Sequence, residues 1–428
     1  MMKGAGRAMD FEAGLAAYLN KRGDWARDFL CRLIAFHSTT GAEAGVQECL
    51  HDLLSGAGFP VKFSPIAESI VDDPDYTPVP GHESYLGRPN VLVDLTGSGG
   101  GKSVILNSHT DVVPGPDGMF NAKFENGAVH GRGACDAKGQ VVTIVLALSA
   151  LKELGVRLKG DVEAQFVIEE EAGGNGSLAA IAGGRRADAA IVFEPTGLGV
   201  RHANRGAAWF KLTVSGRSVH MGRYREGVNA FDEMLGLVPM LKEYEASLRE
   251  ASKGYPGFPD DPSPIVVNVG RVHGGDWPST VPAECVVEGG IAFLPNRTSR
   301  RIVEEVRALI EAKATPWARQ HFCFELSGLR NEAFETSAGH PAVRSFQRAA
   351  ESVLGPRPLE GWTASCDARL FFHRGGMPTI VFGAGDLSRA HSVDERVQID
   401  DIRSAAQVLA KFLADWCGVE GEEKENAC

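Results

Sequence analysis

Short apolar runs alternate with amphipathic stretches in the first half of the chain and again near its end. The apolar runs cover Asn90–Leu95, Val104–Asn107, Val162–Ile168, Ala189–Phe193 and Pro378–Phe382. Helical spacing of apolar residues marks Gln140–Leu154, Pro341–Leu354 and Asp400–Trp416. Continuous apolar strands between helices are typical of a parallel sheet that is covered on both faces. The pattern therefore predicts an α/β fold with a mostly parallel, doubly wound catalytic domain.

The middle of the chain has a different pattern. Apolar and polar residues alternate from Ala208 to Val214, which indicates a half-buried strand. Further strands are expected at Ile265–Val272, Glu284–Phe293 and His321–Leu326, and helices at Asn229–Leu248 and Ser299–Ala314. This strand and helix order predicts a small α+β sandwich inserted into the larger domain. We place the inserted domain at 205–328 and the discontinuous larger domain at 1–204 and 329–428.

Composition narrows the function classes. The 428 residues carry 44 Lys and Arg against 55 Asp and Glu, a net charge of −11, which argues against nucleic-acid binding. The longest apolar stretch, Val141 to Leu151, is shorter than the roughly 20 residues of a membrane span. The N-terminus lacks an apolar secretory segment, and the eight cysteines are scattered without a C-x-x-C pair. We expect a cytoplasmic protein without a membrane partner.

Five short polar segments follow, or lie close to, the C-terminal ends of predicted strands, where open α/β sheets bind ligands. The first holds His109 and Asp111, two residues apart after a strand. Side chains at this spacing share a face, so the carboxylate can orient the imidazole as it does for metal-bound histidines. Taken alone, the pair could equally be a turn histidine beside a capping Asp.

The other four segments add carboxylates and a second histidine. Asp136 precedes a predicted helix, where a capping role is the plain alternative. Glu169–Glu171 end an apolar strand, and three adjacent carboxylates there repel one another unless cations or protons compensate them. Glu194 and His391 follow two further strands. For either of these two alone, capping would be the default interpretation.

Taken together, these residues suit a pair of metal ions. Two dications are balanced by the carboxylates of Asp136, Glu171 and Glu194 and by a bridging hydroxide. Zinc, cobalt and manganese ions accept such mixed nitrogen and oxygen ligands. Paired metals polarise a carbonyl and lower the pKa of a shared water. A further carboxylate, with Glu170 as the spare one, can then shuttle a proton.

The order of these motifs resembles a known enzyme family. S-H-x-D, G-R-G-x-x-D-x-K-G, E-E-E-x-G-G, E-P-T and A-H-x-x-D-E occur in that order, between about residues 25 and 415. They are similar to those of the co-catalytic metallopeptidases and deacylases, a family with acetylornithine deacetylase, succinyl-diaminopimelate desuccinylase, aminoacylase and folate-cleaving carboxypeptidase. The resemblance implies two divalent ions, zinc first, with cobalt or manganese as alternatives.

The resemblance also implies a role for each matching side chain of the metal centre. It makes Asp136 the carboxylate that bridges the two metals. It makes Glu170 the general acid/base and Asp111 the carboxylate that orients a histidine. The remaining metal ligands are His109 and Glu194 for one ion, and Glu171 and His391 for the other.

Two segments outside the metal motifs also match. GRSVHMGRYREGVNA resembles the family's dimerisation lid, which implies a homodimer in which His220 helps to stabilise the oxyanion in the partner's site. SCDARLF resembles a small-x-Asp-x-Arg segment, so Arg369 is a candidate for binding a substrate carboxylate. The alternative is a structural ion pair between Arg369 and Asp367. Ser365 could add a hydrogen bond to the substrate.

The chain departs from the family near the substrate. Ser279 and Thr280 stand where many members have an Asn before the Val-Pro of the lid, and Trp277 and Trp362 are bulky. These departures leave the acyl group and the amine of the substrate open.

We therefore predict a metal-dependent amidohydrolase that cleaves a C–N amide bond of a small carboxylate-bearing molecule, with metal-bound water activated by Glu170. Among the possible activities, we expect first an N-acyl amino acid deacylase, such as a deacetylase. Alternatives are a dipeptidase or carboxypeptidase, and an aminohydrolase or deformylase of a carboxylated aromatic or heteroaromatic amine. Outside the enzymes, a non-catalytic metal-binding relative should have lost Glu170 or a ligand, and this chain keeps them.

Overall fold

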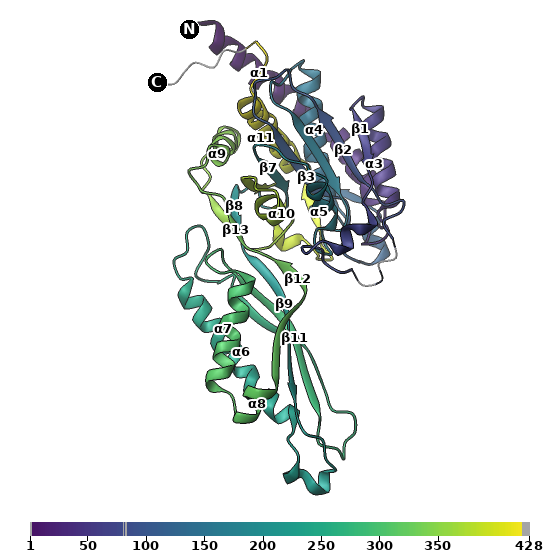
Figure 1. Cartoon of the computed structure of the whole chain (residues 1–428). Coiled ribbons are helices and arrows are strands. Elements are labelled where there is room, and N and C mark those ends of the chain that lie inside the picture. The colour runs from purple at the N-terminus through teal and green to yellow at the C-terminus, as the bar shows by residue number, and fades with distance from the viewer. Residues whose placement is uncertain (1, 80, 82–83, 422–428) are drawn as a thin grey trace. The chain divides into compact units, whose positions relative to one another are not determined.

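The computed structural model describes residues 2–79, 81 and 84–421 and divides the chain into two compact units (Figure 1). The first unit holds the residues up to His202, Thr336–Glu360 and the residues from Cys366 onward. The second holds Ala203–Glu335 and Gly361–Ser365. Residues 422–428, which end the predicted larger domain and include Cys428, lie outside the described residues.

A mostly parallel sheet forms the centre of the first unit. Its strands, in spatial order, are β1 (Val61–Ser64), β2 (Asn90–Leu95), β6 (Val162–Val167), β3 (Val104–His109), β7 (Ala190–Phe193), β15 (Thr379–Phe382) and β8 (Arg201–Asn204). β6, β3, β7 and β15 run parallel, whereas β1, β2 and β8 are antiparallel to their neighbours. His109 pairs with Val167 and Phe382 with Phe193, so the carboxyl ends of the parallel strands meet at one edge. The predicted mostly parallel α/β class is confirmed.

Helices cover the sheet because its strands are apolar on both faces. One apolar cluster joins the strands to α2 (Gly23–Ile34), α3 (Ala44–Gly56), α4 (Lys138–Glu153), α9 (Pro341–Leu354) and α11 (Ile399–Cys417). The helix α1 (Met2–Asn20) contacts α4 and α11. On the other side, α10 (Ala368–His373) contacts β7, β15 and the short helix α5 (Asn175–Ala182) (Figure 1). The start of α5 and the start of α10 thereby lie near the carboxyl ends of the parallel strands.

Smaller elements complete the first unit. The strands β4 (Lys123–Glu125), β5 (Ala128–His130) and β16 (Arg396–Gln398) form an antiparallel sheet in the order β16-β5-β4. Three 3₁₀ turns, η1 (Glu68–Asp72), η2 (Asp117–Phe120) and η4 (Leu387–Arg389), lie in its loops. Among the described residues, no helix of either unit has the length and apolarity that crossing a membrane requires.

The second unit is a four-stranded antiparallel sheet with helices packed on one face. Its strand order is β10 (Val266–Gly274), β11 (Glu284–Phe293), β9 (Gly206–Ser215) and β12 (Phe322–Asn331), with α6 (Ala230–Ala251), α7 (Ser299–Lys313) and α8 (Pro316–His321). Ala208, Phe210, Leu212 and Val214 of β9 are buried in its core, whereas Trp209 is exposed. The alternation thus places one face of β9 in the core. A further short element of this unit is η3 (Met221–Glu226), whereas the short strands β13 (Phe334–Glu335) and β14 (Glu360–Trp362) pair with β8 and complete the nine-stranded sheet.

Candidate metal centre

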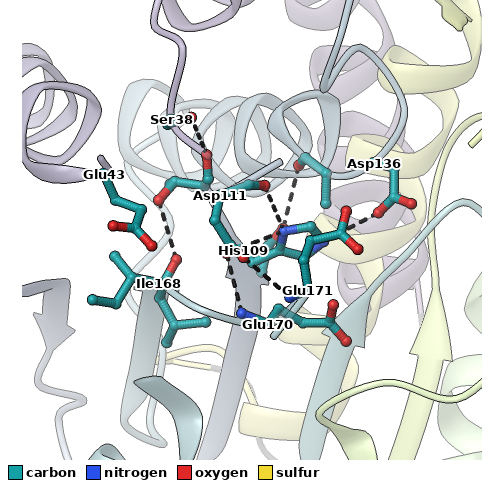
Figure 2. Close-up of polar contacts among 12 residues, drawn as sticks. Ser38, Glu43, His109, Asp111, Asp136, Ile168, Glu170 and Glu171 are labelled. Atoms are coloured by element: carbon teal, nitrogen blue, oxygen red, sulfur yellow. Dashed lines mark hydrogen bonds and ion pairs between the residues drawn. The ribbon is translucent and has the colours of Figure 1, made fainter. Parts of the chain in front are cut away.

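The side chains predicted to form the metal centre meet at the carboxyl edge of the parallel strands. Figure 2 shows His109, Asp111, Asp136, Glu170 and Glu171 there. His109 ends β3, and the acidic turn 169–171 follows β6 directly. Glu194 follows β7, and Asp136 lies two residues before α4. His391 comes from the loop between η4 and β16. Four separate connections of the fold therefore deliver one cluster.

His109 is buried between two carboxylates. Its Nδ1 lies 2.9 Å from the backbone oxygen of Asp111 and 3.5 Å from that residue's Oδ1. Because a carbonyl oxygen can only accept, Nδ1 carries the proton and donates it. Nε2 then faces Asp136 Oδ1 at 3.1 Å and Glu194 Oε2 at 4.0 Å. This orientation presents Nε2 to the acidic cluster, as metal coordination requires.

Asp136 lies between the two histidines. Its Oδ1 is 3.1 Å from His109 Nε2, and its Oδ2 is 3.3 Å from His391 Nε2. His391 Nε2 also lies 3.0 Å from the carboxylate of Glu171. One carboxylate with an oxygen toward each histidine is the arrangement that a bridging ligand needs.

The donor atoms of the cluster converge closely enough to hold ions. His109, Glu170 and Glu194 each offer a ligand atom, and these atoms lie within 4.8 Å of one another. The same holds for His109, Asp136 and Glu171. Imidazole nitrogens with carboxylate oxygens are the donors that zinc, cobalt and manganese ions accept. Both groups contain His109, and His391, which is in neither, lies 3.3 Å from Asp136 and 3.0 Å from Glu171, so the residues present fit a metal-binding cluster of the kind inferred from the sequence.

The electrostatics of the cluster point the same way. Burial, together with the repulsion of nearby carboxylates, raises the pKa of Glu170 and of Glu194 well above the usual range. Burial and the neighbouring Asp136 raise the pKa of Glu171 to about 7. A buried group of acids with such values lacks positive charge, and divalent ions would supply it.

The pKa values of the two histidines are raised by the carboxylates around them, which favour a positive charge on the rings. Burial alone would lower the pKa of His109, but the hydrogen bonds to Asp111 and Asp136 raise it well above its ordinary value. The carboxylates of Asp136 and Glu171 raise the pKa of His391 to about 10. Burial would raise the pKa of Asp136, and the two histidines outweigh it and hold that pKa low. Protons on these imidazoles thus occupy the place that metal ions would take.

Asp111 does more than orient a histidine. Its buried carboxylate accepts the backbone N–H of Glu170 at 3.2 Å and that of Glu171 at 3.0 Å (Figure 2). Asp111 therefore holds the ring of His109 mainly through its backbone oxygen, and its side chain holds the turn that carries two acids of the cluster.

The side chain that holds the backbone of Asp136 in place was not predicted from the sequence. The buried Glu395 accepts the backbone N–H of Asp136 and that of Cys135, each at 3.2 Å, and binds Arg132 at 2.6 Å. The D-E that follows His391 in the A-H-x-x-D-E motif was a signal for it, but its partners lie about 260 residues away.

The negative charge of Glu169, the first acid of the turn 169–171, is compensated by neighbours of its own. Glu169 is buried and accepts hydrogen bonds from Arg88 at 2.6 Å, Tyr85 at 2.8 Å and Asn175 at 3.0 Å. Arg88 also binds Glu43 through two nitrogens, at 2.8 and 3.0 Å. The guanidinium of Arg88, which was not predicted from the sequence, thus relieves the predicted repulsion within Glu169–Glu171 at Glu169.

The predicted substrate residues lie in both units. In the first unit, Arg369 is only 6% exposed and donates from Nη2 to the backbone oxygen of Gly173 at 2.8 Å. The structure records no ion pair between Arg369 and Asp367, and Arg369 Nε and Asp367 Oδ2 are buried without a hydrogen-bond partner among the described residues. In the second unit, the exposed His220 accepts the N–H of Gly222 at 3.1 Å. There too, Ser365 Oγ accepts from Asn331 at 3.1 Å.

Comparison with known proteins gives a consistent picture. The profile of Peptidase family M20/M25/M40 matches residues 105–415. An N-formyl-4-amino-5-aminomethyl-2-methylpyrimidine deformylase from Bacillus subtilis is 27% identical over 367 residues, 79% of this chain and 85% of that protein. A succinyl-diaminopimelate desuccinylase from Gluconacetobacter diazotrophicus is 28% identical over 402 residues, 90% of this chain and 95% of that protein.

Solved structures share the architecture. A dinuclear metal binding peptidase of the M20 family from Bacillus subtilis superposes with a TM-score of 0.65 at 13% sequence identity. The match covers 94% of this chain and 99% of that one. At this identity the likeness concerns the fold.

Proposed function

The chain belongs to Peptidase family M20/M25/M40, as the motif order indicates, and from this premise we propose that it is a metal-dependent hydrolase of a C–N amide bond in a small carboxylate-bearing substrate. One observation carries the proposal: Glu170, a partly buried acid, stands beside the buried His109 and Glu194 within a cluster of metal-ligand geometry. Two relatives named above are a desuccinylase and a deformylase, names that denote the removal of an acyl group.

We assign the residues of the cluster as ligands of two divalent ions, zinc first, with cobalt or manganese as alternatives. When bound, such ions polarise an amide carbonyl and lower the pKa of a water molecule. The ligands are His109, Asp136, Glu171, Glu194 and His391, with Asp136 as the bridge.

Glu170 acts as the general base and then as the general acid. Its carboxylate takes a proton from the attacking water and delivers it to the amine nitrogen as the C–N bond breaks. The carboxylate of Glu170 has an oxygen within 4.8 Å of the ligand atoms of His109 and Glu194, which places it beside the proposed metal-bound water. Asp111 keeps the turn of Glu170 in place through the backbone N–H groups.

Two substrate classes fit the proposal. The first is an N-acyl amino acid, in keeping with the desuccinylase relative. The second is an N-formyl derivative of a heteroaromatic amine, which the deformylase relative favours. A dipeptidase or carboxypeptidase activity would use the same centre. The products separate the three: a deacylase releases an acyl carboxylic acid and one amino acid, a deformylase releases formate and the free amine, and a dipeptidase releases two amino acids.

The lid, the dimer and the cellular location remain part of the proposal. We propose that the second unit pairs two copies of the chain and that His220, exposed at the start of η3, donates to the developing oxyanion. We also propose that the protein works in the cytoplasm. The cysteines of the described residues are free thiols, which fits a reducing compartment.

The test is product release from a panel of N-acetyl, N-formyl and N-succinyl amino acids, dipeptides and N-formyl heteroaromatic amines. Chelated protein and Glu170→Gln serve as blanks, and Glu125→Gln, on an exposed strand, serves as the matched control. We expect turnover of one class, about 10²- to 10⁴-fold lower in Glu170→Gln at unchanged metal content. A Glu170→Gln enzyme as active as Glu125→Gln would overturn the assignment.

A further inference from the structure

The turn that carries Glu170 and Glu171 is built on two glycines. Gly173 N–H donates to the backbone oxygen of Glu170 at 2.9 Å, and Gly174 N–H donates to that of Glu169 at 2.7 Å. The φ angles of Gly173 and Gly174 are +117° and +83°, a region that side chains rarely allow. The position of both acids therefore depends on this tight turn between β6 and α5.

Two elements hold the turn from different sides. Asp111, after β3, accepts its first two N–H groups, those of Glu170 and Glu171. Arg369, at the start of α10, donates from Nη2 to the oxygen of Gly173 at 2.8 Å. The turn is thus fixed at its beginning by a carboxylate and at its end by a guanidinium.

Asp367 closes the space beneath the turn. A Cβ atom on Gly174 would lie 2.1 Å from Asp367 Oδ1, so the carboxylate packs directly against the glycine backbone. Arg369 and Asp367 are 6% and 1% exposed. Helix α10, which they begin, contacts α5 and the strands β7 and β15, so it is a rigid base for both side chains.

We propose that Arg369 and Asp367 are positioning residues that hold the turn Glu170–Gly174, and that Arg369 does not bind the substrate carboxylate. The kinetic part of this inference rests on the proposed function, whereas its structural part does not. A guanidinium that is buried and bonded to a protein carbonyl acts on the reaction through the turn, because it fixes where the carboxylates of Glu170 and Glu171 stand.

The experiment compares three variants. Arg369→Met removes the donor and keeps an unbranched apolar side chain, and Arg369→Lys keeps a positive donor without the planar fork. Arg374→Met is the matched control, because Arg374 follows the same helix but forms surface ion pairs with Asp73 and Asp75. The probes are an N-acyl amino acid that the enzyme turns over and the same compound with its carboxylate converted to an amide.

We expect Arg369→Met to lower kcat by about 10- to 100-fold on both probes, with KM within about threefold, as for other residues that orient metal ligands. Arg369→Lys should recover part of kcat, and Arg374→Met should match the unmodified protein. Hydrogen exchange of the peptide over residues 170–178, measured without metal, should accelerate in Arg369→Met alone.

The opposite pattern would overturn the inference. If Arg369 binds substrate, either Arg369 variant should raise KM at least tenfold for the carboxylate probe only, with normal kcat and normal exchange. Should Arg369→Met fail to fold, Arg369→Lys is read by the same criteria. An inactive unmodified protein would refute the proposed function and leave the exchange measurement to decide the positioning role.

Discussion

Replacing Arg88 by methionine tests whether one guanidinium neutralises the buried acids behind the catalytic turn. Arg88 binds Glu43 through two hydrogen bonds of 2.8 and 3.0 Å and Glu169 through one of 2.6 Å. The side chains of Arg88, Glu43 and Glu169 are 9%, 0% and 0% exposed. Methionine keeps the unbranched apolar stem and removes the charge, so the change isolates the electrostatic contribution.

The expected magnitude follows from these contacts. Hydrogen bonds to charged groups contribute about 1.5–3 kcal/mol each, but the sum over three overstates the loss, because a carboxylate can take up a proton. Burial already raises the pKa of Glu43 to about 7. The buried carboxylate of Glu169 then keeps its hydrogen bonds from Tyr85 and Asn175 but loses its counter-charge, at a cost of about 3–5 kcal/mol. For a first unit of roughly 290 residues, about 4 kcal/mol lowers Tm by about 7 °C.

The raised pKa of Glu43 also determines how the stability loss of Arg88→Met depends on pH. A carboxyl group whose pKa is raised in the folded state loses folding stability as the pH rises from its unfolded-state pKa to its folded-state pKa. Arg88 lowers the pKa of Glu43, so its removal raises that pKa further and extends the loss to higher pH. Because Glu43 can protonate near pH 6, the deficit of Arg88→Met should be smaller at pH 6 than at pH 8.

Thermal unfolding at both pH values measures this prediction. Arg27→Gln, which loses surface ion pairs with Asp24 and Asp28, is the control and should shift Tm by less than about 2 °C. Arg88→Met combined with Glu169→Gln should recover part of the loss. The reasoning would be refuted if Arg88→Met lowered Tm no more than Arg27→Gln does. It would also be refuted if the double variant recovered none of the lost Tm.

Three further predictions concern the site. Gly174→Ala should cost more than about 3 kcal/mol in denaturant unfolding, because its Cβ meets Asp367. Gly184→Ala, with a similar φ of +88° and nothing within 4 Å, should cost only about 1 kcal/mol, and equal losses would contradict the packing argument. Asp111→Asn should weaken metal binding by about 10- to 100-fold in a metal titration, and an unchanged affinity would show that the two N–H bonds do not matter. When free metal is present at a hundred times its Kd, removing it with a chelator should lower the free energy of unfolding by about 2.7 kcal/mol, and added zinc should restore it. A chelator without effect on Tm would speak against bound ions.

Local pattern was enough for the framework of the fold. The runs Asn90–Leu95 and Val104–Asn107 became β2 and β3, and Gln140–Leu154 became α4 within two residues at each end. Strands buried on both faces must be apolar throughout, so such runs are legible in the sequence. The strands β4 and β16 have only three residues each, too few for such a signature, and neither was predicted.

Long-range partners had no local signal. The contacts of Arg88 with Glu43 and Glu169 join residues 45 and 81 positions apart, and that of Arg132 with Glu395 spans 263 positions. A buried charge is stable only beside an opposite charge, and the identity of that partner depends on how the chain is folded. For the same reason, the sequence left the role of Arg369 open between a substrate contact and an ion pair.

The sequence by itself determined which donor atoms could meet, because their motifs follow strands whose carboxyl ends share one edge of the sheet. Without the resemblance to a family, the residue pattern could not assign different roles to the three neighbouring glutamates 169–171. Only the tertiary structure sends Glu169 toward Arg88 and places Glu170 and Glu171 toward the histidines. The physical reason is that charge compensation and desolvation act through space, over a few ångströms, whatever the separation along the chain.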